Sequence, residues 1–243
     1  MNIIKLNAID STNDYLKNLL DKKPVINYTV VTANFQNKGK GQMGGFWESE
    51  AGKNLICSVY LSNSIIKLSN QFVINIIVCL AIKKSLHKFN IPQLSVKWPN
   101  DIMSGNKKIC GVLIENNLKG AQITSAVIGI GLNVNQTVFP VSLDRVSSLQ
   151  LLCGKGFELN YLLKKIILSL KRNIALLEAK EFKSLEVAYL DVLFKKNIPT
   201  MFKDSRDALF MGMVLGVSKD GKLQIALEDE TVLEFGIKEI SFL

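Results

Sequence analysis

The spacing of apolar residues along the chain changes several times between a helical period and a strand-like one. Helical spacing, with apolar residues three or four positions apart, predicts four helices. The first begins at Ser11 or Thr12, and Ser69 and Asn160 are expected to cap the next two. A further helix is predicted near Leu185 to Leu193. The apolar stripes of the first three helices are Leu16, Leu19 and Leu20; Phe72, Val73, Ile76, Ile77, Leu80 and Ile82; and Leu162, Leu163, Ile166, Ile167, Leu170, Ile174 and Leu177. Such stripes are typical of a buried core.

Short segments rich in β-branched residues lie between these helices and predict strands. They are residues 2–6, 25–35, 54–61, 93–98, 108–116 and 123–130. Helices and strands do not alternate regularly, so the pattern does not predict a doubly wound parallel sheet. We expect an α+β fold in which a mixed β-sheet carries its helices on one face.

The end of the chain differs from the rest, with a boundary predicted at Asn197-Ile198-Pro199. Only short strands are expected beyond it, at residues 200–203, 209–217, 222–227 and 231–235. Lys219-Asp220-Gly221 is typical of a hairpin turn. Because a segment this short would be only marginally stable alone, we predict that it forms a small barrel docked on the larger domain. The predicted domains are residues 1–196 and 197–243.

No stretch of the chain is predicted to cross a membrane or to direct secretion. The longest apolar run, Phe72 to Ile82, is interrupted by Asn75 and is shorter than the ~20 residues that a spanning helix needs. No secretory leader is visible, since the polar segment Asp10 to Asn13 comes early. The cysteines form no Cys-x-x-Cys pair and are expected to be buried thiols: Cys57, Cys79, Cys110 and Cys153. We predict a cytoplasmic protein.

Charge and histidine content limit the chemistry. The net charge is +9, which favours an acidic partner or a polyanionic nucleotide. Only Arg145, Arg172 and Arg206 are arginine among 30 basic residues, whereas base readout depends on arginine forks. No helix-turn-helix is visible either, so we predict no sequence-specific DNA binding. With His87 as the only histidine, catalysis is expected to use lysines, carboxylates, amides and backbone groups.

The densest group of glycines lies between two predicted strands, in Gly39-Lys40-Gly41-Gln42-Met43-Gly44-Gly45-Phe46-Trp47. Its backbone N–H groups can converge on an anion and Lys40 adds a positive charge, so the loop suits a phosphate. A plain flexible hairpin loop explains the same composition. The P-loop and dinucleotide patterns do not fit, because a strand follows instead of a helix. So many glycines predict a loop that is mobile until a ligand closes it.

Further polar groups fall at strand ends or in predicted loops. They are Ser11-Thr12-Asn13, Gln36, Lys97-Trp98-Pro99-Asn100-Asp101, Lys108 with Gly111, and Gly129-x-Gly131-x-Asn133. Pro99 removes a backbone donor and Asn-Asp favours a turn, so residues 97–101 are expected to be a strand ending in a polar loop. Each segment alone also has a structural explanation as a helix cap, a turn or a surface lysine.

In this order and spacing, these segments and the glycine loop resemble the catalytic core of biotin protein ligases. That family shows Ser-Thr-Asn, a glutamine before a GRGRxGxxW-like loop, KWPND, a Lys-hydrophobic-x-Gly segment and a G-x-G-x-N element. The resemblance covers nearly the whole chain. It implies a mixed sheet similar to that of class II aminoacyl-tRNA synthetases, followed by an SH3-like barrel that fits residues 198–243.

The resemblance implies a ligase with biotin and Mg-ATP as substrates. Biotin would react with ATP to give biotinyl-5′-AMP and pyrophosphate, and a lysine of a carboxylase biotin carboxyl carrier domain would then accept biotin. Lys108 and Lys40 are implied to be catalytic. The implied biotin-binding residues are Ser11, Thr12, Asn13, Gln36, Gly39, Lys40, Gly41, Gln42, Lys108 and Gly111. The implied ATP- and adenylate-binding residues are Lys40, Gln42, Trp47, Asn100, Asp101, Gly129, Gly131 and Asn133. The magnesium ligands are not identified, and the ATP phosphates are expected to hold most of the ion.

Two positions depart from the family pattern. Lys40 stands where the loop usually has its first arginine, which keeps the charge and loses the fork. Gln42 stands at the following arginine position and loses a charge, so the adenylate is expected to be held less tightly. The DNA-binding module of some members is not found, so a repressor role is not expected. A monomer or weak homodimer is expected.

Two other functions stay open at this point. A lipoate–protein ligase shares the fold, but its arginine pair and Ser-Gly-Gly-Gly segment are not found here, whereas KWPND is present. A binding protein that has lost catalysis is the other alternative. The presence of Lys108, Asn100 and Asp101 argues against it.

Overall fold

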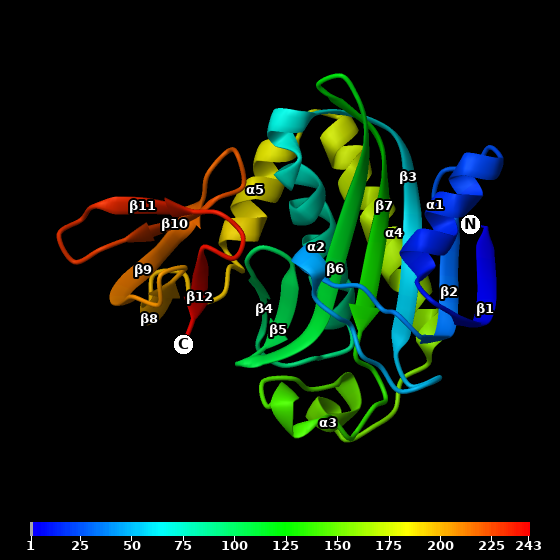
Figure 1. The fold of residues 1–243 in the computed structure, drawn as a ribbon, viewed down its shortest axis with the longest axis horizontal. Coiled ribbons are helices and arrows are strands. Elements are labelled where there is room, and N and C mark those ends of the chain that lie inside the picture. The colour runs from blue at the N-terminus through cyan, green and yellow to red at the C-terminus, as the bar shows by residue number, and fades with distance from the viewer. Residues whose placement is uncertain (1) are drawn as a thin grey trace.

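The chain folds around two β-sheets in a computed structural model that describes residues 2–243, with side chains outside 63–65. The larger sheet is mixed, because β1 and β2 are parallel and all other neighbours are antiparallel. Its order is β1 (Ile3–Ile9), β2 (Val30–Gln36), β3 (Leu55–Lys67), β7 (Gln122–Leu132), β6 (Lys107–Lys119), β5 (Asp101–Ser104) and β4 (Leu94–Lys97). Figure 1 shows this sheet beside the smaller one. The arrangement confirms the predicted α+β fold.

One face of the larger sheet is covered by α2 (Phe72–His87), on which α4 (Leu159–Glu178) and α5 (Phe182–Leu190) pack. Because α2 lies between the sheet and α4, it is apolar on nearly every side, and both Ile74 and Ile77 are fully buried. The side-chain amide of Asn173 in α4 donates to Ile77 O at 2.9 Å. Most of the hydrophobic core therefore lies on this face.

The short helix α1 (Thr12–Lys22) lies on the opposite face, in front of the sheet in Figure 1. Its Leu16 packs with Val31 and Val127 in a separate cluster, whereas the neighbouring Val30 points into the main core. Side chains alternate between faces along a strand, so the two clusters mark the two faces. The prediction that the helices lie on one face holds for α2, α4 and α5. Helix α1, which lies on the other face, is the exception.

Two of the three predicted helix caps are wrong. Ser11 does cap α1, accepting from Asp14 N at 3.4 Å. Ser69 lies in a 3-10 turn at Leu68–Asn70, and α2 begins after Gln71 without a side-chain cap. The cap of α4 is Glu158, whose carboxylate accepts from the backbone N–H groups of Asn160 and Tyr161. A carboxylate can satisfy two orphan N–H groups and suits the positive end of the helix dipole, so it replaces the amide expected there.

Several elements are longer than predicted or were not predicted at all. The single strand expected at 93–98 is followed by a second one, so β4 and β5 form a hairpin with a cis Trp98–Pro99 peptide at its turn. Asp101 therefore begins a strand and does not lie in a loop. The short helix α3 (Leu149–Cys153) also has too few residues to show a helical period. The last predicted helix lies at α5, a few residues earlier than expected.

The smaller sheet is antiparallel throughout. Its order is β11 (Val232–Phe235), β10 (Leu223–Ala226), β9 (Leu209–Val217), β8 (Pro199–Asp204) and β12 (Ile240–Phe242). Phe202 is fully buried and contacts the rings of Phe210 and Phe242. The indole of Trp98 donates to Gly221 O at 2.9 Å and so ties the hairpin of the larger sheet to this one. The SH3-like barrel and the division after residue 196 stay predictions.

The described residues include no helix long and apolar enough to span a bilayer. Three cysteines are fully buried as free thiols and Cys153 is half-buried. Burial raises the pKa of Cys57 to about 12, so its thiol stays protonated near neutral pH. The expectation of reduced, buried thiols is confirmed for Cys57, Cys79 and Cys110.

Candidate active site

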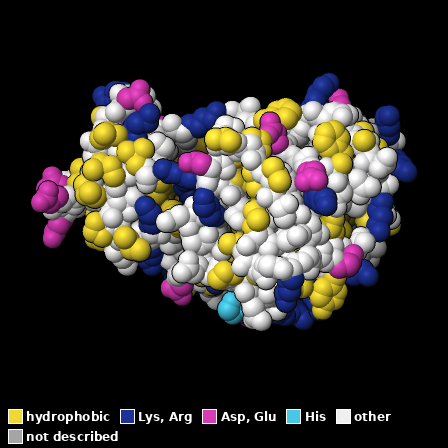
Figure 2. Space-filling model, turned by 90° about the horizontal axis from the view of Figure 1, so that it is seen from below, with side chains coloured by type: hydrophobic (Ala, Val, Ile, Leu, Met, Phe, Trp, Pro, Cys, Tyr) yellow, Lys and Arg dark blue, Asp and Glu magenta, His cyan; other side chains and the backbone are white. Residues whose placement is uncertain are grey.

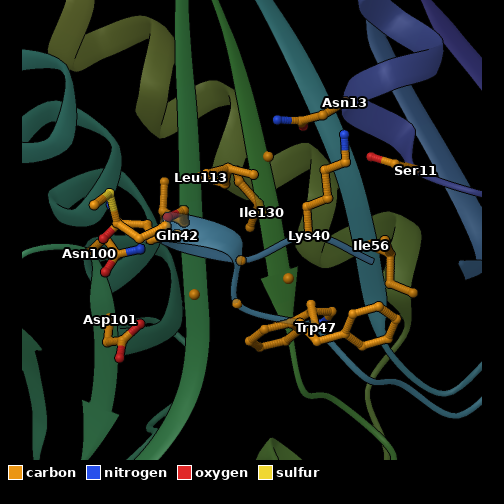
Figure 3. Close-up of a pocket in the computed structure, with 18 of the residues that line it drawn as sticks. Ser11, Asn13, Lys40, Gln42, Trp47, Ile56, Asn100, Asp101, Leu113 and Ile130 are labelled. Carbon is orange, nitrogen blue, oxygen red and sulfur yellow. The ribbon is translucent and has the colours of Figure 1, made fainter. Parts of the chain in front are cut away.

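A cavity of about 300 Å³ lies on the α1 face of the larger sheet. Its walls come from the start of α1, the glycine loop, and strands β2, β3, β5, β6 and β7. Figure 3 shows the polar groups entering it from two sides, with Ser11 and Asn13 opposite Asn100 and Asp101. The lining includes nearly all the predicted site residues: Ser11, Thr12, Asn13, Gln36, Lys40, Gly41, Gln42, Trp47, Asn100, Asp101, Lys108, Gly111, Gly129 and Gly131.

The α1 side of the cavity is a buried hydrogen-bond network. Gln36 Oε1 accepts from both the backbone N–H and the hydroxyl of Thr12, at 2.8 and 3.0 Å. Ser58 on β3 donates to Asn13 Oδ1 at 2.5 Å and lies 2.8 Å from Thr12 Oγ1. Ser58 is fully buried and no sequence motif pointed to it. These groups are fixed before any ligand arrives, which lowers the entropic cost of binding one.

Asn13 is held by charged residues outside the cavity lining. Its side-chain N–H donates to Glu115 at 2.7 Å, and Glu115 pairs with Lys17 at 2.6 Å. A Cβ atom at Gly129 would come within 2.6 Å of Asn13 Oδ1. Glycine is therefore required at 129 because the Asn13 amide occupies the space above the strand.

The glycine loop adopts a closed turn over the cavity. Gly41 N–H donates to Gly45 O at 2.7 Å, and Lys40 and Phe46 form a β-bridge. The ammonium of Lys40 lies 2.6 and 2.8 Å from the carboxylate oxygens of Asp14, on the first turn of α1. Partial burial acts to raise the pKa of Asp14, but hydrogen bonds from Lys40 and Lys17 outweigh it, so this pKa lies below its usual value. In this structure the Lys40 ammonium is therefore paired with the Asp14 carboxylate.

Trp47, at the end of the loop, lies on a part of the sheet where two glycines leave the backbone without side chains. Gly111 and Gly131 are direct cross-strand partners on β6 and β7. Cβ atoms at these glycines would lie 3.1 and 2.4 Å from the indole ring. The ammonium of Lys108 lies 5.6 Å from the centre of the same ring. A flat aromatic surface beside a lysine is suited to a nucleotide base and its phosphate.

The other side of the cavity carries an ion pair between Lys108 on β6 and Asp101 on β5, at 2.8 Å. Lys108 is fixed through its backbone, because its N–H donates to Arg145 O at 2.7 Å and its carbonyl accepts from Ser147 at 2.9 Å. Asn100 is fixed by hydrogen bonds in both directions with the backbone of Val112. A cation and a carboxylate in contact at a cavity wall can stabilise charge and accept a proton.

Two predicted binding residues do not line the cavity. Gly39 lies at the start of the loop beside Trp47, where a Cβ atom would meet Trp47 O at 2.3 Å. Asn133 is buried and its side chain donates to Ser147 O at 3.1 Å. Both positions support the walls: Gly39 lets the two ends of the loop pair closely, and Asn133 holds the segment that fixes Lys108.

The sequence did not point to the apolar lining or to the residues from the C-terminal sheet. These are Met43, Phe46, Ile56, Cys57, Val112, Leu113, Ile130, Ile237 and Lys238. The ammonium of Lys238 donates to Met43 O at 2.6 Å, so a turn of the smaller sheet contacts the glycine loop. Residues 195 positions apart in the chain share this contact, and no local pattern marks it.

Comparison with known proteins fits this geometry. A model described as the Biotin/lipoate A/B protein ligase family matches residues 6–133. The chain belongs to this family. The matched range includes the Ser-Thr-Asn segment, the glycine loop, Lys108 and the Gly129–Asn133 element, so the family features are those that build the cavity.

Individual relatives are similar to this ligase-family chain over most of its length. The Bifunctional ligase/repressor BirA of Bacillus subtilis is 27% identical over 216 residues, which cover 87% of this chain and 64% of that protein. Biotin--protein ligase 1, chloroplastic, of Arabidopsis thaliana is 26% identical over 93% of this chain and 62% of its own length. The chain therefore spans less than two thirds of these relatives. A solved structure of biotin protein ligase from Aquifex aeolicus in complex with biotin and ATP is 27% identical, with a TM-score of 0.83, and covers 100% of this chain and 98% of that one.

Proposed function

We propose that this protein is an ATP-dependent ligase that makes biotinyl-5′-AMP and transfers biotin to a lysine of a carboxyl carrier domain. One observation carries the proposal: a single cavity brings together the Ser-Thr-Asn network, the glycine loop and the Lys108–Asp101 pair. The similarity to the Aquifex aeolicus enzyme, solved with biotin and ATP, extends over the whole chain and supports it.

The α1 side of the cavity suits the head group of biotin. A urea group needs both donors and acceptors, and Ser11, Thr12, Asn13 and Gln36 offer hydroxyl and amide groups there. Ile56 and Leu113 add apolar surface for the rest of a small bicyclic molecule. The carboxylate of the valerate chain would then extend toward Lys108.

Formation of the adenylate gathers negative charge at the α-phosphorus of ATP. Lys108 would stabilise that charge, together with loop N–H groups other than those of Gly41 and Gly45, which donate within the loop. The carboxylate nucleophile needs no base. Lys40 can join them only by leaving Asp14. A phosphate of ATP would then replace the Asp14 carboxylate as the partner of its ammonium. Trp47 would contact the adenine.

Magnesium would enter as Mg-ATP. The described side chains contain no cluster of three His, Cys, Asp or Glu residues that could hold a metal ion. Asp101, beside Asn100, is the carboxylate of the cavity lining. Mg²⁺ commonly takes one or two carboxylates, several waters and substrate phosphates, so Asp101 suits a nucleotide-borne ion.

Transfer requires the acceptor lysine to lose a proton from an amine with a pKa of ~10.4. Lys108 and its cationic neighbours would lower that pKa as the amine approaches, and Asp101 lies within the same wall to accept the proton. The amine then attacks the acyl carbon of the mixed anhydride and AMP leaves.

The test is mass spectrometry of a biotin carboxyl carrier domain incubated with the protein, ATP and either biotin or lipoate. We expect the acceptor mass to rise by one biotinyl group with biotin and to stay unchanged with lipoate. A carrier domain whose acceptor lysine is replaced by arginine is the matched control. Modification by lipoate alone, or none with either acid, would overturn the proposal.

A further inference from the structure

A second cavity, of about 420 Å³, lies beyond the Lys108–Asp101 pair. These two residues line both cavities, so the pair is the wall between them. The rest of the lining comes from β4, β5 and the start of β6, from the segment 142–146, from residues 194–195 and from the end of the chain at residues 242–243. We call it the basic cavity, because Lys97, Lys107, Lys108, Arg145 and Lys195 line it.

Positive side chains dominate this cavity, with Lys97, Lys107, Lys108, Arg145 and Lys195 against the carboxylates of Asp101 and Asp144. Figure 2 shows Lys and Arg side chains gathered between the smaller lobe and the main body. Asp101 is already paired with Lys108. Among the side chains that the structure describes, Lys97, Arg145 and Lys195 have no ion-pair partner.

Lys97 is the residue at which the repulsion among these positive charges is clearest. It belongs to the Lys-Trp-Pro-Asn-Asp segment, yet the first cavity gives it no role, because it does not line that cavity. Its ammonium is half-buried and lies 5.0 Å from the ring centre of Phe242. Burial, and then the charges of Lys108, Arg145 and Lys195, lower its pKa, while Asp101 opposes them. A bound anion would remove this repulsion.

The position of the basic cavity relates it to the reaction at the first one. Across the sheet, the Ser-Thr-Asn network lies by β2 and β3, Lys108 is on β6, and Lys97 is on β4 at the far edge. In phosphoryl transfer the attacking and leaving oxygens lie roughly in line through phosphorus. A carboxylate that approaches from the α1 side therefore directs the leaving group past Lys108, toward Lys97.

We propose that the basic cavity binds the diphosphate portion of ATP, first as its β- and γ-phosphates and then as the pyrophosphate that leaves. This inference rests on the proposed function. A bond forms between the biotin carboxylate oxygen and the α-phosphorus, and the bond from that phosphorus to the bridging oxygen breaks. The electron pair leaves with pyrophosphate, and no proton is transferred. Arg145 offers a planar fork and Lys97 a point charge to the released oxygens.

Direct titration of the protein with inorganic pyrophosphate by calorimetry, without ATP or biotin, tests the cavity itself. We expect Lys97→Met and Arg145→Gln each to raise the Kd for pyrophosphate by about tenfold or more, because each removes a charged hydrogen-bond donor. Lys171→Met is the matched control, since Lys171 also lies over an aromatic ring, 4.7 Å from that of Tyr28, but on α4. Equal affinities in all four proteins, or an equal loss in the control, would overturn the proposal.

Activity assays then separate the sources of the diphosphate. We expect both variants to need more pyrophosphate to convert biotinyl-5′-AMP back to ATP, and to show a higher KM for ATP at unchanged biotin affinity. A change in the reverse reaction alone would assign the cavity to released pyrophosphate, and a change in the KM for ATP alone to the intact nucleotide. If no version makes the adenylate, the proposed function fails, while the calorimetry still decides the anion site. If only transfer from preformed biotinyl-5′-AMP to the carrier is slowed, with pyrophosphate binding unchanged, the cavity binds acidic groups of the acceptor and the proposal is wrong.

Discussion

A Cβ atom at Gly131 would lie 2.4 Å from Cε2 of Trp47, closer than real Cβ contacts come. The indole rests directly on the backbone of β7, and the cross-strand partner of Gly131 is a second glycine, Gly111. This contact links the G-x-G-x-N element to the glycine loop, although more than 80 residues separate them in sequence. The two elements therefore form one surface, and a change in either alters the other.

Gly131→Ala tests this surface. The added methyl group must displace the indole, and with it the end of the glycine loop, because the three atoms nearest to that Cβ all belong to the Trp47 ring. We expect the KM for ATP to rise about tenfold or more while biotin affinity stays near that of the wild type. Gly156→Ala is the matched control, since the nearest atom to its Cβ lies at 3.6 Å. Unchanged ATP kinetics in Gly131→Ala would show that Trp47 has no part in nucleotide binding.

Lys108→Ala tests the proposed charge at phosphorus. Loss of one well-placed cation from a transition state commonly costs about 10²–10³ in rate, so pyrophosphate release from biotin and ATP is expected to fall by that factor. The circular dichroism spectrum and melting temperature should change little, because Lys108 is held mainly through its backbone. Lys119→Ala, at the other end of β6, is the control. Wild-type pyrophosphate release in Lys108→Ala would remove this residue from the mechanism.

The pair between Lys40 and Asp14 predicts a pH-dependent loop. The pKa of Asp14 lies below its ordinary value of 3.8, so the ion pair is present above that pH and is lost as pH falls through the lower folded-state pKa. We expect Asp14→Asn to speed proteolysis within residues 39–47 at neutral pH. As pH falls below 3.8 and through that lower pKa, cleavage of the wild-type loop by pepsin should approach that of the variant. Equal cleavage of both proteins at neutral pH would show that this pair does not hold the loop.

Gln42→Arg tests the second departure from the family pattern. Gln42 lines the cavity, and an arginine there would place a guanidinium near the adenylate phosphate. We expect release of biotinyl-5′-AMP to slow by about tenfold, measured by stopped-flow displacement. Gln42→Met has a side chain of similar length without charge and is expected to release the adenylate no more slowly than the wild type. Identical off-rates for arginine and glutamine would assign Gln42 no special effect.

Most of the motif residues that the sequence singled out meet in one cavity, because each motif is short and its members lie at strand ends, where local patterns fix the backbone. Ser11, Lys108 and Gly131 all line the cavity for that reason. Ser58 could not be predicted, since a buried serine in an apolar strand shows its partner only after β3 meets α1. The fold shows the same limit: the β-branched residues of β7 were visible, whereas the short strand β5 depends on the turn that pairs it with β4.

The contact from Lys238 to the glycine loop is the clearest case of information absent from any local pattern, and it yields the last prediction. Lys238 and Met43 both have positive φ angles, of 66° and 49°, which cost non-glycine residues free energy and persist only where surrounding contacts hold them. At Lys238 the turn is held by Glu239, which accepts from Gly236 N–H at 2.6 Å. The smaller sheet is therefore placed to keep the loop closed over the first cavity.

Lys238→Met removes the donor to Met43 O and leaves the apolar stem in place. We expect faster release of biotinyl-5′-AMP and faster proteolysis of residues 39–47, with an unchanged melting temperature, because the turn keeps its own hydrogen bonds. Lys238→Arg retains a donor and should restore both properties, whereas a purely structural role would not distinguish Met from Arg. Lys222→Met, at an exposed position of the same sheet, is the control. If the loop of Lys238→Met is as well protected as that of the wild type, the smaller sheet does not control loop closure. Any loss of activity on removing residues 198–243 would then have to come from other contacts of that segment, such as those at Trp98, Ile237 and Phe242.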